Sequence, residues 1–414
     1  MGTTYRGAEK VPYWENIQIA ANLVDGKGYA IDLSMRNYMY FHGQQIPVIE
    51  GTRPTALKPP IYPLMVALIF LLFGFKNFFA LFLFQAIVSA LTCGTVFLHL
   101  NKYSRNMAII GSLGLALYPP FVYHSVTATE NTTLLLFLIA LFFFYLTRIP
   151  RNNSLRNWII TGVVGAILAL TEVAAIPFIL ASLFYLALFT ITRNPHTFKN
   201  VTASIACFMV VISPWILRNY ITFNEFMLFK SGSAQSMLRG LYEAGTGIII
   251  PEETFQRLEM EGRDKNEVQE DNAIKKILIP LIYRNLDTFI TVNIPRNFMY
   301  FWWQTKKYQK DRSLRYLFGR KLPYILLLTF ALPSMIYWIS SLIINPRTAL
   351  RENVRQYLGL ILILSFTIPY CIFGATLLRY HFPIQLVMFG FFAETLNYLH
   401  SKITFPTESL PEPI

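Results

Sequence analysis

Long apolar runs, each close to the length of a membrane-spanning helix, dominate the chain after residue 58. A helix needs roughly 20 apolar residues to cross the hydrocarbon core of a bilayer. Such runs lie at roughly 59–75, 77–98, 106–126, 130–147, 157–173, 174–192, 200–217, 323–344, 356–376 and 381–399. The pattern predicts an all-α integral membrane protein with about ten candidate spans.

The short loops between these runs predict how the helices are oriented. Because Lys and Arg resist translocation, basic loops stay in the cytoplasm. The basic loops contain Lys102 and Arg105; Arg148, Arg151 and Arg156; Arg193 and Lys199; and Arg347, Arg351 and Arg355. They share one side only if the run 59–75, which opens with Pro59 and Pro60, lies in the interface instead of spanning. The prediction becomes about nine transmembrane helices plus interfacial helices.

Four regions follow from this assignment. We expect a first outer loop with interfacial helices at 1–75, a first transmembrane bundle at 76–217, a large outer loop at 218–322 and C-terminal transmembrane helices at 323–414. The large loop should be mostly helical. Its end, 289–303, is rich in Phe, Tyr and Trp and suits the headgroup layer.

Composition narrows the class of protein further. Of 414 residues, 54% are hydrophobic and only 14% charged, which excludes a soluble enzyme. The net charge of +13 indicates cytoplasmic loops and contact with membrane lipids, not nucleic acid. Cys93, Cys207 and Cys371 lie in separate apolar runs, so the pattern is neither a disulfide scaffold nor a cysteine metal site.

Lys58 is the first polar residue that membrane burial alone does not explain. It precedes Pro59 and Pro60, which restrict the chain to an extended bend. This bend would hold the ammonium at the membrane surface, where a lipid phosphate lies. The alternative is an ordinary interfacial lysine whose stem lies along apolar surface.

Two carboxylates stand at the outer ends of predicted spans. Carboxylates near hydrocarbon are costly and are usually kept for a partner, an ion or a proton. Glu130 could instead be a helix N-terminal acid, with Thr129 as the cap. Glu172 lies in a turn after Thr171 and could simply be hydrated.

Two arginines lie on the same predicted face. Arg218 leaves a span beside Trp215 and Tyr220, and Arg379 precedes Tyr380. Each could contact a phosphate, and each could equally be an interfacial anchor, because aromatic and basic residues are common at span ends.

Near the N-terminus, apolar residues recur at helical spacing from Tyr13 to Leu23, so Glu15 should stand at the start of an interfacial helix. The sequence Asp25-Gly26-Lys27-Gly28 should end it. The chain contains no Gly-rich phosphate loop after a strand, and its histidines are scattered, which argues against a nucleotide-sugar domain.

Taken in order, these motifs resemble those of the GT-C membrane glycosyltransferases, in particular the protein O-mannosyltransferase-like and lipid A aminoarabinose or galacturonic acid transferase-like enzymes. The resemblance covers nearly the whole chain. Its pieces are Ala21-Asn22-Leu23 with Gly26, Gly28 and Tyr29; Pro54-Thr55-Ala56 with Lys58-Pro59-Pro60, Tyr62 and Pro63; Leu71-Leu72-Phe73-Gly74; Glu130; Pro214-Trp215 with Arg218-Asn219-Tyr220; and Arg379-Tyr380.

The resemblance implies transfer of a sugar from a polyprenyl-phosphate-linked donor to a lipid, glycan or protein acceptor, on the outer face of the plasma membrane. It implies inversion by an acidic general base in the first outer loop. Lys58 matches the lysine that holds the leaving phosphate, and Glu130 matches the second acid. Arg218 and Arg379 match basic residues that could meet the donor. No cofactor is certain, and a divalent metal stays open.

One departure concerns the base. The family carries an acidic pair after a first spanning helix, and the matching positions here are Pro12 and Tyr13, with Glu9 and Glu15 as the nearest acids. Three alternatives stay open: the sequence begins downstream of that helix, Glu15 serves as the base, or the chain is an inactive relative that acts as a partner subunit. A transporter or flippase for a lipid-linked saccharide is the competing function, although transporters place charges at mid-membrane.

Overall fold

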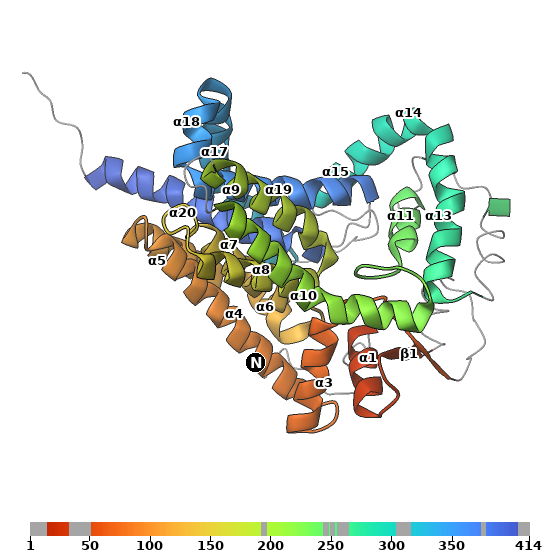
Figure 1. The fold of residues 1–414 in the computed structure, drawn as a ribbon. Helices are drawn as coiled ribbons and strands as arrows, with labels where there is room; N and C mark the ends of the chain where they lie inside the picture. The colour runs from red at the N-terminus through yellow and green to blue at the C-terminus, as the bar shows by residue number, and fades with distance from the viewer. Residues whose placement is uncertain are drawn as a thin grey trace, which may run out of the picture.

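The computed structural model describes residues 15–32, 51–191, 197–242, 248, 253–254, 265–303, 316–373 and 378–404. Within these residues the chain is helical apart from loops and one short antiparallel pair of strands (Figure 1). The predicted all-α class is therefore confirmed.

The elements follow the apolar runs closely. In chain order they are α1 Glu15–Val24, β1 Ala30–Asp32, β2 Thr52–Pro54, α3 Ile61–Phe73, α4 Phe78–Leu100, α5 Arg105–Ala116, α6 Pro119–Thr127, α7 Thr132–Leu146, α8 Leu155–Ala169, η2 Val173–Ala175, α9 Ile176–Ile191, α10 Thr197–Phe223, α11 Ser233–Tyr242, α13 Glu267–Arg284, α14 Leu286–Thr288, η3 Phe289–Asn293, α15 Ile294–Trp303, η4 Leu317–Lys321, α17 Leu322–Ile344, α18 Pro346–Glu352, α19 Val354–Phe373, η5 Leu378–His381 and α20 Phe382–Thr404.

The long helices run between two ends of a bundle that differ in charge. We call the end that holds Lys58, Glu130 and Glu172 the site end, and the end that holds Arg148 and Arg151 the basic end. α7 begins just after Glu130 and stops just before Arg148, and α8 returns to the site end. At about 1.5 Å per residue, the 15 residues of α7 separate the two ends by about 22 Å.

The number of spans is bounded by helix length. Four described segments are long and apolar enough to cross a membrane: α4, α10, α19 and the continuous helix Leu317–Ile344. The count rises to six if α5 with α6, bent by 48°, and α13 with Leu286–Trp303, bent by 87°, each form one span. α3, α7, α8 and α9 are shorter apolar helices, so the figure of about nine spans stays a prediction.

The run 59–75 forms α3, which is only 13 residues long. At about 1.5 Å per residue it extends about 20 Å, less than the roughly 30 Å of a hydrocarbon core. α7 and α8, with 15 residues each, are nearly as short, so the interfacial position of this run stays a prediction. α3 packs along α1 (Figure 1).

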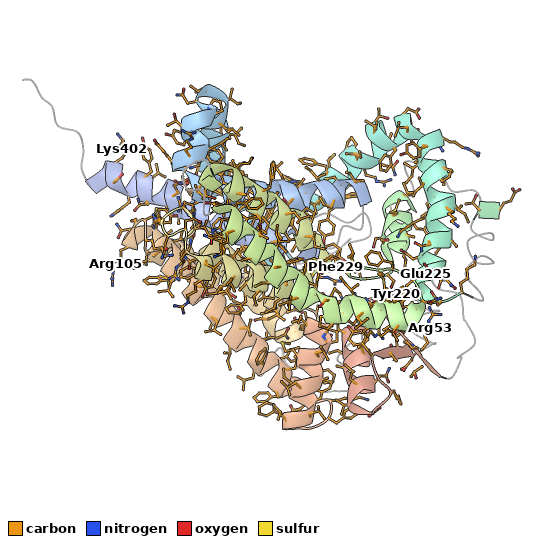
Figure 2. The ribbon with its side chains drawn as sticks, in the orientation of Figure 1. Arg53, Arg105, Tyr220, Glu225, Phe229 and Lys402 are labelled. Atoms are coloured by element: carbon orange, nitrogen blue, oxygen red, sulfur yellow. The ribbon has the colours of Figure 1, made fainter. Side chains whose placement is uncertain are left out.

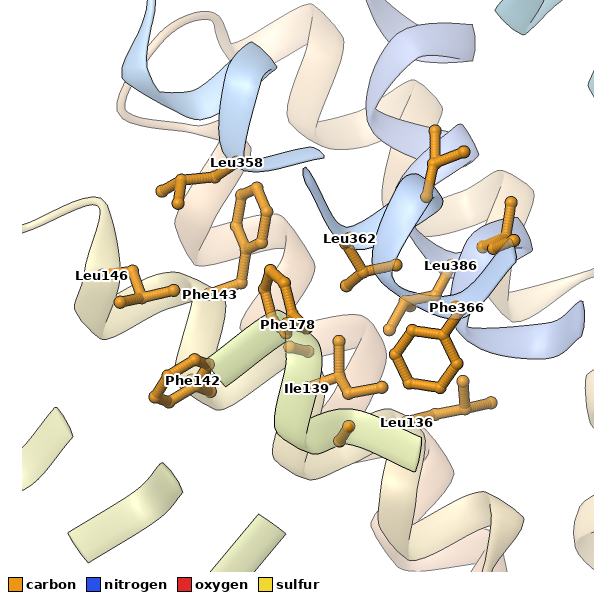
Figure 3. Close-up of a cluster of buried hydrophobic side chains, with 14 of the residues drawn as sticks. Leu136, Ile139, Phe142, Phe143, Leu146, Phe178, Leu358, Leu362, Phe366 and Leu386 are labelled. Atoms are coloured by element: carbon orange, nitrogen blue, oxygen red, sulfur yellow. The ribbon is translucent and has the colours of Figure 1, made fainter. Parts of the chain in front are cut away.

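The main core lies where α7, α9, α19 and α20 meet. Leu136, Ile139 and Phe142 of α7 are buried against Phe178 of α9 and Phe366 of α19 (Figure 3). On the outer faces of other helices, apolar side chains stay exposed, as expected for a surface that faces lipid instead of water. Examples are Leu91, Val210 and Leu217.

The N-terminal unit brings Glu15 toward the bundle. α1 begins at Glu15, as predicted, and it ends where Gly26 adopts φ +74°. There the Lys27 amide donates to the Asn22 carbonyl at 2.8 Å, which closes a Schellman-type cap. Gln18 Nε2 donates to Asp32 Oδ2 at 2.6 Å, and this bond ties α1 to β1.

The large loop is helical in its described part, as predicted. α10 continues to Phe223, so the boundary expected at 217 falls inside a helix. α11 packs on α13 beyond the end of α10 (Figure 1). The aromatic segment forms α15, with Phe298 and Trp303 exposed.

Candidate active site

A pocket of about 340 Å³ opens at the site end of the bundle. It collects side chains from α1, the segment before α3, the turns before α7 and after α8, the segment before α11, the end of α19 and η5. Its charged lining residues are Glu15, Lys58, Glu130, Glu172, Lys230 and Arg379. Three cations therefore face three carboxylates in one cavity.

Lys58 points into this pocket from a loop whose backbone is fixed. The Tyr29 hydroxyl donates to the Lys58 carbonyl at 2.9 Å and to the Pro59 carbonyl at 3.2 Å. The Lys58 ammonium lies 3.9 Å from Glu15 Oε1. Burial acts to lower the pKa of Lys58, but nearby carboxylates, Glu15 foremost, raise it overall above the usual lysine value. Lys58 is therefore a cation at neutral pH.

Glu130 and Arg379 form the second charge pair. Arg379 Nη1 donates to Glu130 Oε1, and His124 Nε2 lies 3.8 Å from the other carboxylate oxygen. Burial raises the pKa of Glu130 overall, although Arg379 opposes the shift. Asn131 occupies the N-cap position of α7, and no acid lies in the first turn. Glu130 is thus placed as a partner of Arg379, not as a helix N-terminal acid capped by Thr129.

The Glu172 carboxylate accepts hydrogen bonds from protein groups and is not simply hydrated. Asn131 Nδ2 donates to Glu172 Oε2 at 3.1 Å and to the Thr171 carbonyl at 2.7 Å, and the Ala174 amide donates to Glu172 Oε1 at 3.4 Å. Burial acts to raise the pKa of Glu172, but Lys230 and the Asn131 bond, together with weaker effects, lower it overall. Glu172 is therefore an anion at neutral pH.

Lys230 was missed by the sequence analysis. It follows α10 on a short segment, between Phe229 and Ser231, and no motif or spacing marks it. The only indication in the sequence was that Lys230 follows the predicted span 200–217, which ends on the outer side of the membrane.

An aromatic wall completes the pocket. Tyr370 and Tyr380 stack with ring centroids 4.6 Å apart and planes at 13°, and Phe301 stacks behind Tyr370 at 5.4 Å. The Arg379 guanidinium carbon lies 5.1 Å from the centre of the Tyr380 ring. A flat aromatic face beside a cation can pack against a sugar ring or an isoprenoid chain.

Arg218 is not brought into the pocket. Its guanidinium donates to the Thr55 carbonyl at 2.8 Å and to the Tyr29 carbonyl at 2.9 Å, and it lies 5.2 Å from the Trp215 ring centre. These bonds hold the loop that leads to Lys58. In this geometry Arg218 positions another residue and does not face a ligand.

Glu267 supports the same loop from α13. Its carboxylate accepts from Thr55 Oγ1 at 2.6 Å and from the Ala56 amide at 2.9 Å, and Ser231 also donates to it. Glu267 and Arg218 therefore hold residues 55–58 from two sides. The sequence analysis did not single out Glu267, because an acid in a charged helix carries no distinguishing pattern.

Four of the five predicted site residues thus meet in one pocket. They are Glu15, Lys58, Glu130 and Arg379. Glu9, Pro12 and Tyr13, which bear on the missing acidic pair, lie outside the described residues. Within the described part of the chain, no three His, Cys, Asp or Glu side chains are grouped to hold a metal ion. These residues alone do not supply a metal-ligand set.

Comparison with known proteins gives a family-model match to part of the chain and a shared fold. The model for dolichyl-phosphate-mannose-protein mannosyltransferases matches residues 57–217, which include Lys58, Glu130 and Glu172. No curated protein sequence matches the chain.

Two solved structures resemble the chain at low identity. The oligosaccharyltransferase of Archaeoglobus fulgidus, crystallised with Zn and sulfate, is 13% identical, with a TM-score of 0.52 over 95% of this chain and 46% of that one. ArnT from Cupriavidus metallidurans is 14% identical, with a TM-score of 0.36 over 92% of this chain and 72% of that one. The chain thus spans about half the length of the oligosaccharyltransferase, with which it shares a fold. The mannosyltransferase family model over residues 57–217 and this shared fold both support the resemblance to the GT-C membrane glycosyltransferases.

Proposed function

We propose that the protein transfers a sugar from a polyprenyl-phosphate-linked donor to a hydroxyl of a lipid, glycan or protein acceptor, with inversion at the anomeric carbon. The observation that carries this proposal is the pocket in which Lys58, Lys230 and Arg379 face Glu15, Glu130 and Glu172. Cations suit the departing phosphate, and carboxylates suit the removal of a proton. The adjoining aromatic wall suits the sugar or the first isoprene units of the donor.

In the proposed step, the acceptor oxygen attacks the anomeric carbon while the bond from that carbon to the phosphate oxygen breaks. The electron pair leaves with the polyprenyl phosphate, whose charge Lys58 and Arg379 stabilise. The acceptor proton passes to Glu15. A single displacement of this kind inverts the anomeric configuration.

The charge pairs explain how the donor would prepare the site. In the structure the Lys58 ammonium lies 3.9 Å from Glu15, which is close enough for attraction but longer than a hydrogen bond. A donor phosphate that binds Lys58 would compete with Glu15 for this cation. The Glu15 carboxylate would then be available to accept the proton of the acceptor. Donor binding and activation of the base are linked in this scheme.

The placement of charge supports an outward-facing site. Lys102, Arg148, Arg151 and Arg156 gather at the basic end, and α7 and α8 connect that end to the pocket. Clusters of Lys and Arg favour the cytoplasmic side of a membrane. We therefore infer that the pocket faces the outer side of the plasma membrane.

The test is transfer by the full chain in a neutral detergent, with a panel of polyprenyl-phosphate hexoses and pentoses and a panel of acceptors. Mass spectrometry should detect an acceptor heavier by one sugar and an equal amount of released polyprenyl phosphate. Lys58→Met should lower the rate of transfer by about 10² to 10³. Lys76→Met is the matched control, because Lys76 is an exposed cation on the turn after α3 and does not line the pocket.

Two variants identify the base. Glu15→Gln should stop transfer while donor binding persists, whereas Glu225→Gln, outside the pocket lining and beyond the end of α10 (Figure 2), should have no effect. If Glu130→Gln stops transfer and Glu15→Gln does not, the proton goes to Glu130. If no donor yields product and vesicles containing the protein move the labelled donor across the bilayer, the transporter alternative replaces this proposal.

A further inference from the structure

A second cavity of about 500 Å³ lies at the basic end, where α7 stops and α8 begins. Four cationic side chains line it: Lys102, Arg148, Arg151 and Arg156. No Asp or Glu among the described residues does so. The site end balances cations with carboxylates, but this cavity has a net positive charge.

All four cationic residues are exposed, and three of them lie over aromatic rings at this end of the bundle. Lys102 Nζ lies 3.9 Å from the centre of the Phe144 ring, and the Arg148 guanidinium carbon lies 4.3 Å from the same centre. The Arg151 guanidinium carbon lies 5.0 Å from the centre of the Tyr103 ring. Burial, and then repulsion from Arg148 and Arg151, lowers the pKa of Lys102 to about 8. An anion in the cavity would relieve this repulsion.

The beginning of α8 adds further anion-binding groups. Ser154 caps this 15-residue helix by accepting from the Asn157 amide at 3.4 Å, and both residues line the cavity. The positive end of the helix dipole thus points at the same space as the four cations.

The walls of the cavity are suited to a lipid. Tyr145 and Ile160 line it from α7 and α8, and the exposed Leu155 lies at the start of α8. Beyond this end, the residues of α7 and α8 are buried or half-buried, so the acyl chains of a bound lipid would lie outside the cavity. Basic pockets between transmembrane helices bind anionic lipid headgroups. We propose that this cavity binds the phosphodiester headgroup of an anionic phospholipid, with its acyl chains in the surrounding bilayer.

The test uses the full chain in a neutral detergent and native mass spectrometry. Phosphatidylglycerol is the probe, phosphatidylcholine is the zwitterionic comparison, and inorganic phosphate is the soluble competitor. The variant Arg148→Gln/Arg151→Gln removes two of the cations. The control Arg105→Gln/Lys402→Gln removes two exposed cations that do not line the cavity and lie at the same side of the bundle (Figure 2).

The double glutamine variant should bind phosphatidylglycerol about 25-fold more weakly, since each cation near the membrane surface contributes about a factor of five. The control variant should bind like the wild type, and Arg148→Lys/Arg151→Lys should keep most of the affinity. If the glutamine variant fails to fold, binding is compared between the wild type and this lysine variant instead.

Three results would overturn the proposal. The first is equal binding by the wild type and a folded glutamine variant. The second is an equal loss in the control, which would assign binding to overall charge. The third is displacement of the lipid by inorganic phosphate at an equal concentration, which would make free phosphate the ligand.

Discussion

The Glu130–Arg379 pair offers a sharp test of the site geometry, because it joins residues 249 positions apart in the sequence. We consider Glu130→Gln, Arg379→Gln and the double variant. Removal of Arg379 alone leaves a largely buried carboxylate without its ion-pair partner, with His124 at 3.8 Å and Lys58 as the remaining cation that acts on it. Removal of both charges leaves no such mismatch.

The expected coupling follows from the burial of the two groups. Their side chains are 17% and 25% exposed, which places the pair between a surface and a fully buried ion pair. Surface pairs contribute about 0–1 kcal/mol, whereas loss of one partner of a buried pair costs about 3–5 kcal/mol. We therefore expect a coupling free energy of about 2 kcal/mol between the two substitutions.

The measurement is the free energy of unfolding of all four proteins in mixed detergent micelles. A thiol-reactive dye can report unfolding, because Cys371 is buried in the folded protein and Cys93 and Cys207 are half-buried. Arg379→Gln should be the least stable single variant. The double variant should be more stable than the sum of the single effects predicts, by the coupling energy.

Additive effects would refute the reasoning. If the double variant loses the sum of the two single losses to within about 0.5 kcal/mol, the two charges do not interact directly. The contact between η5 and the start of α7 would then be wrong, and the pocket would lose its second charge pair.

Three further predictions concern the pocket. Lys58→Met should lower kcat by about 10² to 10³, and Lys58→Arg by less, because a cation that stabilises the leaving phosphate acts mainly in the transition state; steady-state kinetics with a fixed donor checks both. Glu267→Gln should lower kcat about tenfold through the 55–58 loop without changing the pH profile of the reaction, whereas a change in that profile would mean that Glu267 titrates in the step. Because the folded pKa of Glu172 is lowered, its contribution to stability is present above its ordinary pKa of 4.5 and is lost as the pH falls through the folded value; unfolding measured from pH 7 to pH 3 should show a smaller acid loss in Glu172→Gln.

The positions of the helices were largely predictable, because the lengths of the apolar runs and the capping residues at their ends indicate the same boundaries. The run 77–98 became α4, Phe78–Leu100, capped by Asn77 and ending near Asn101. The run 106–126 was predicted as one span, but it bends by 48° between α5 and α6. Pro119 and Pro120 lie at this bend, where proline cannot continue the hydrogen bonding of the preceding helix. The unbroken apolar composition hid that signal.

The membership of the site was only partly predictable. The distribution of Lys and Arg in the short loops predicted that Lys58, Glu130 and Arg379 lie at one end of the bundle. Each of them adjoins a predicted span on the same side of the membrane. Which cation pairs with which acid depends on packing between distant helices, and a single sequence does not encode that visibly. Tyr370 illustrates the limit: inside an apolar run it looks like any core aromatic, and only its stacking on Tyr380 reveals it as part of the wall.

The two ends of α7 show why charge balance distinguishes the two cavities. At the site end, the pairs Lys58–Glu15 and Arg379–Glu130 keep the pocket close to neutral, so the proposed anionic donor would replace a carboxylate partner and later depart. A pocket with cations alone would hold the phosphate product too tightly for turnover. At the basic end, Arg148 and its neighbours have no carboxylate in the cavity lining, so a bound anion would stay. Balanced charge therefore suits a ligand that is exchanged in every reaction cycle, and unbalanced charge suits one that anchors the protein in its membrane.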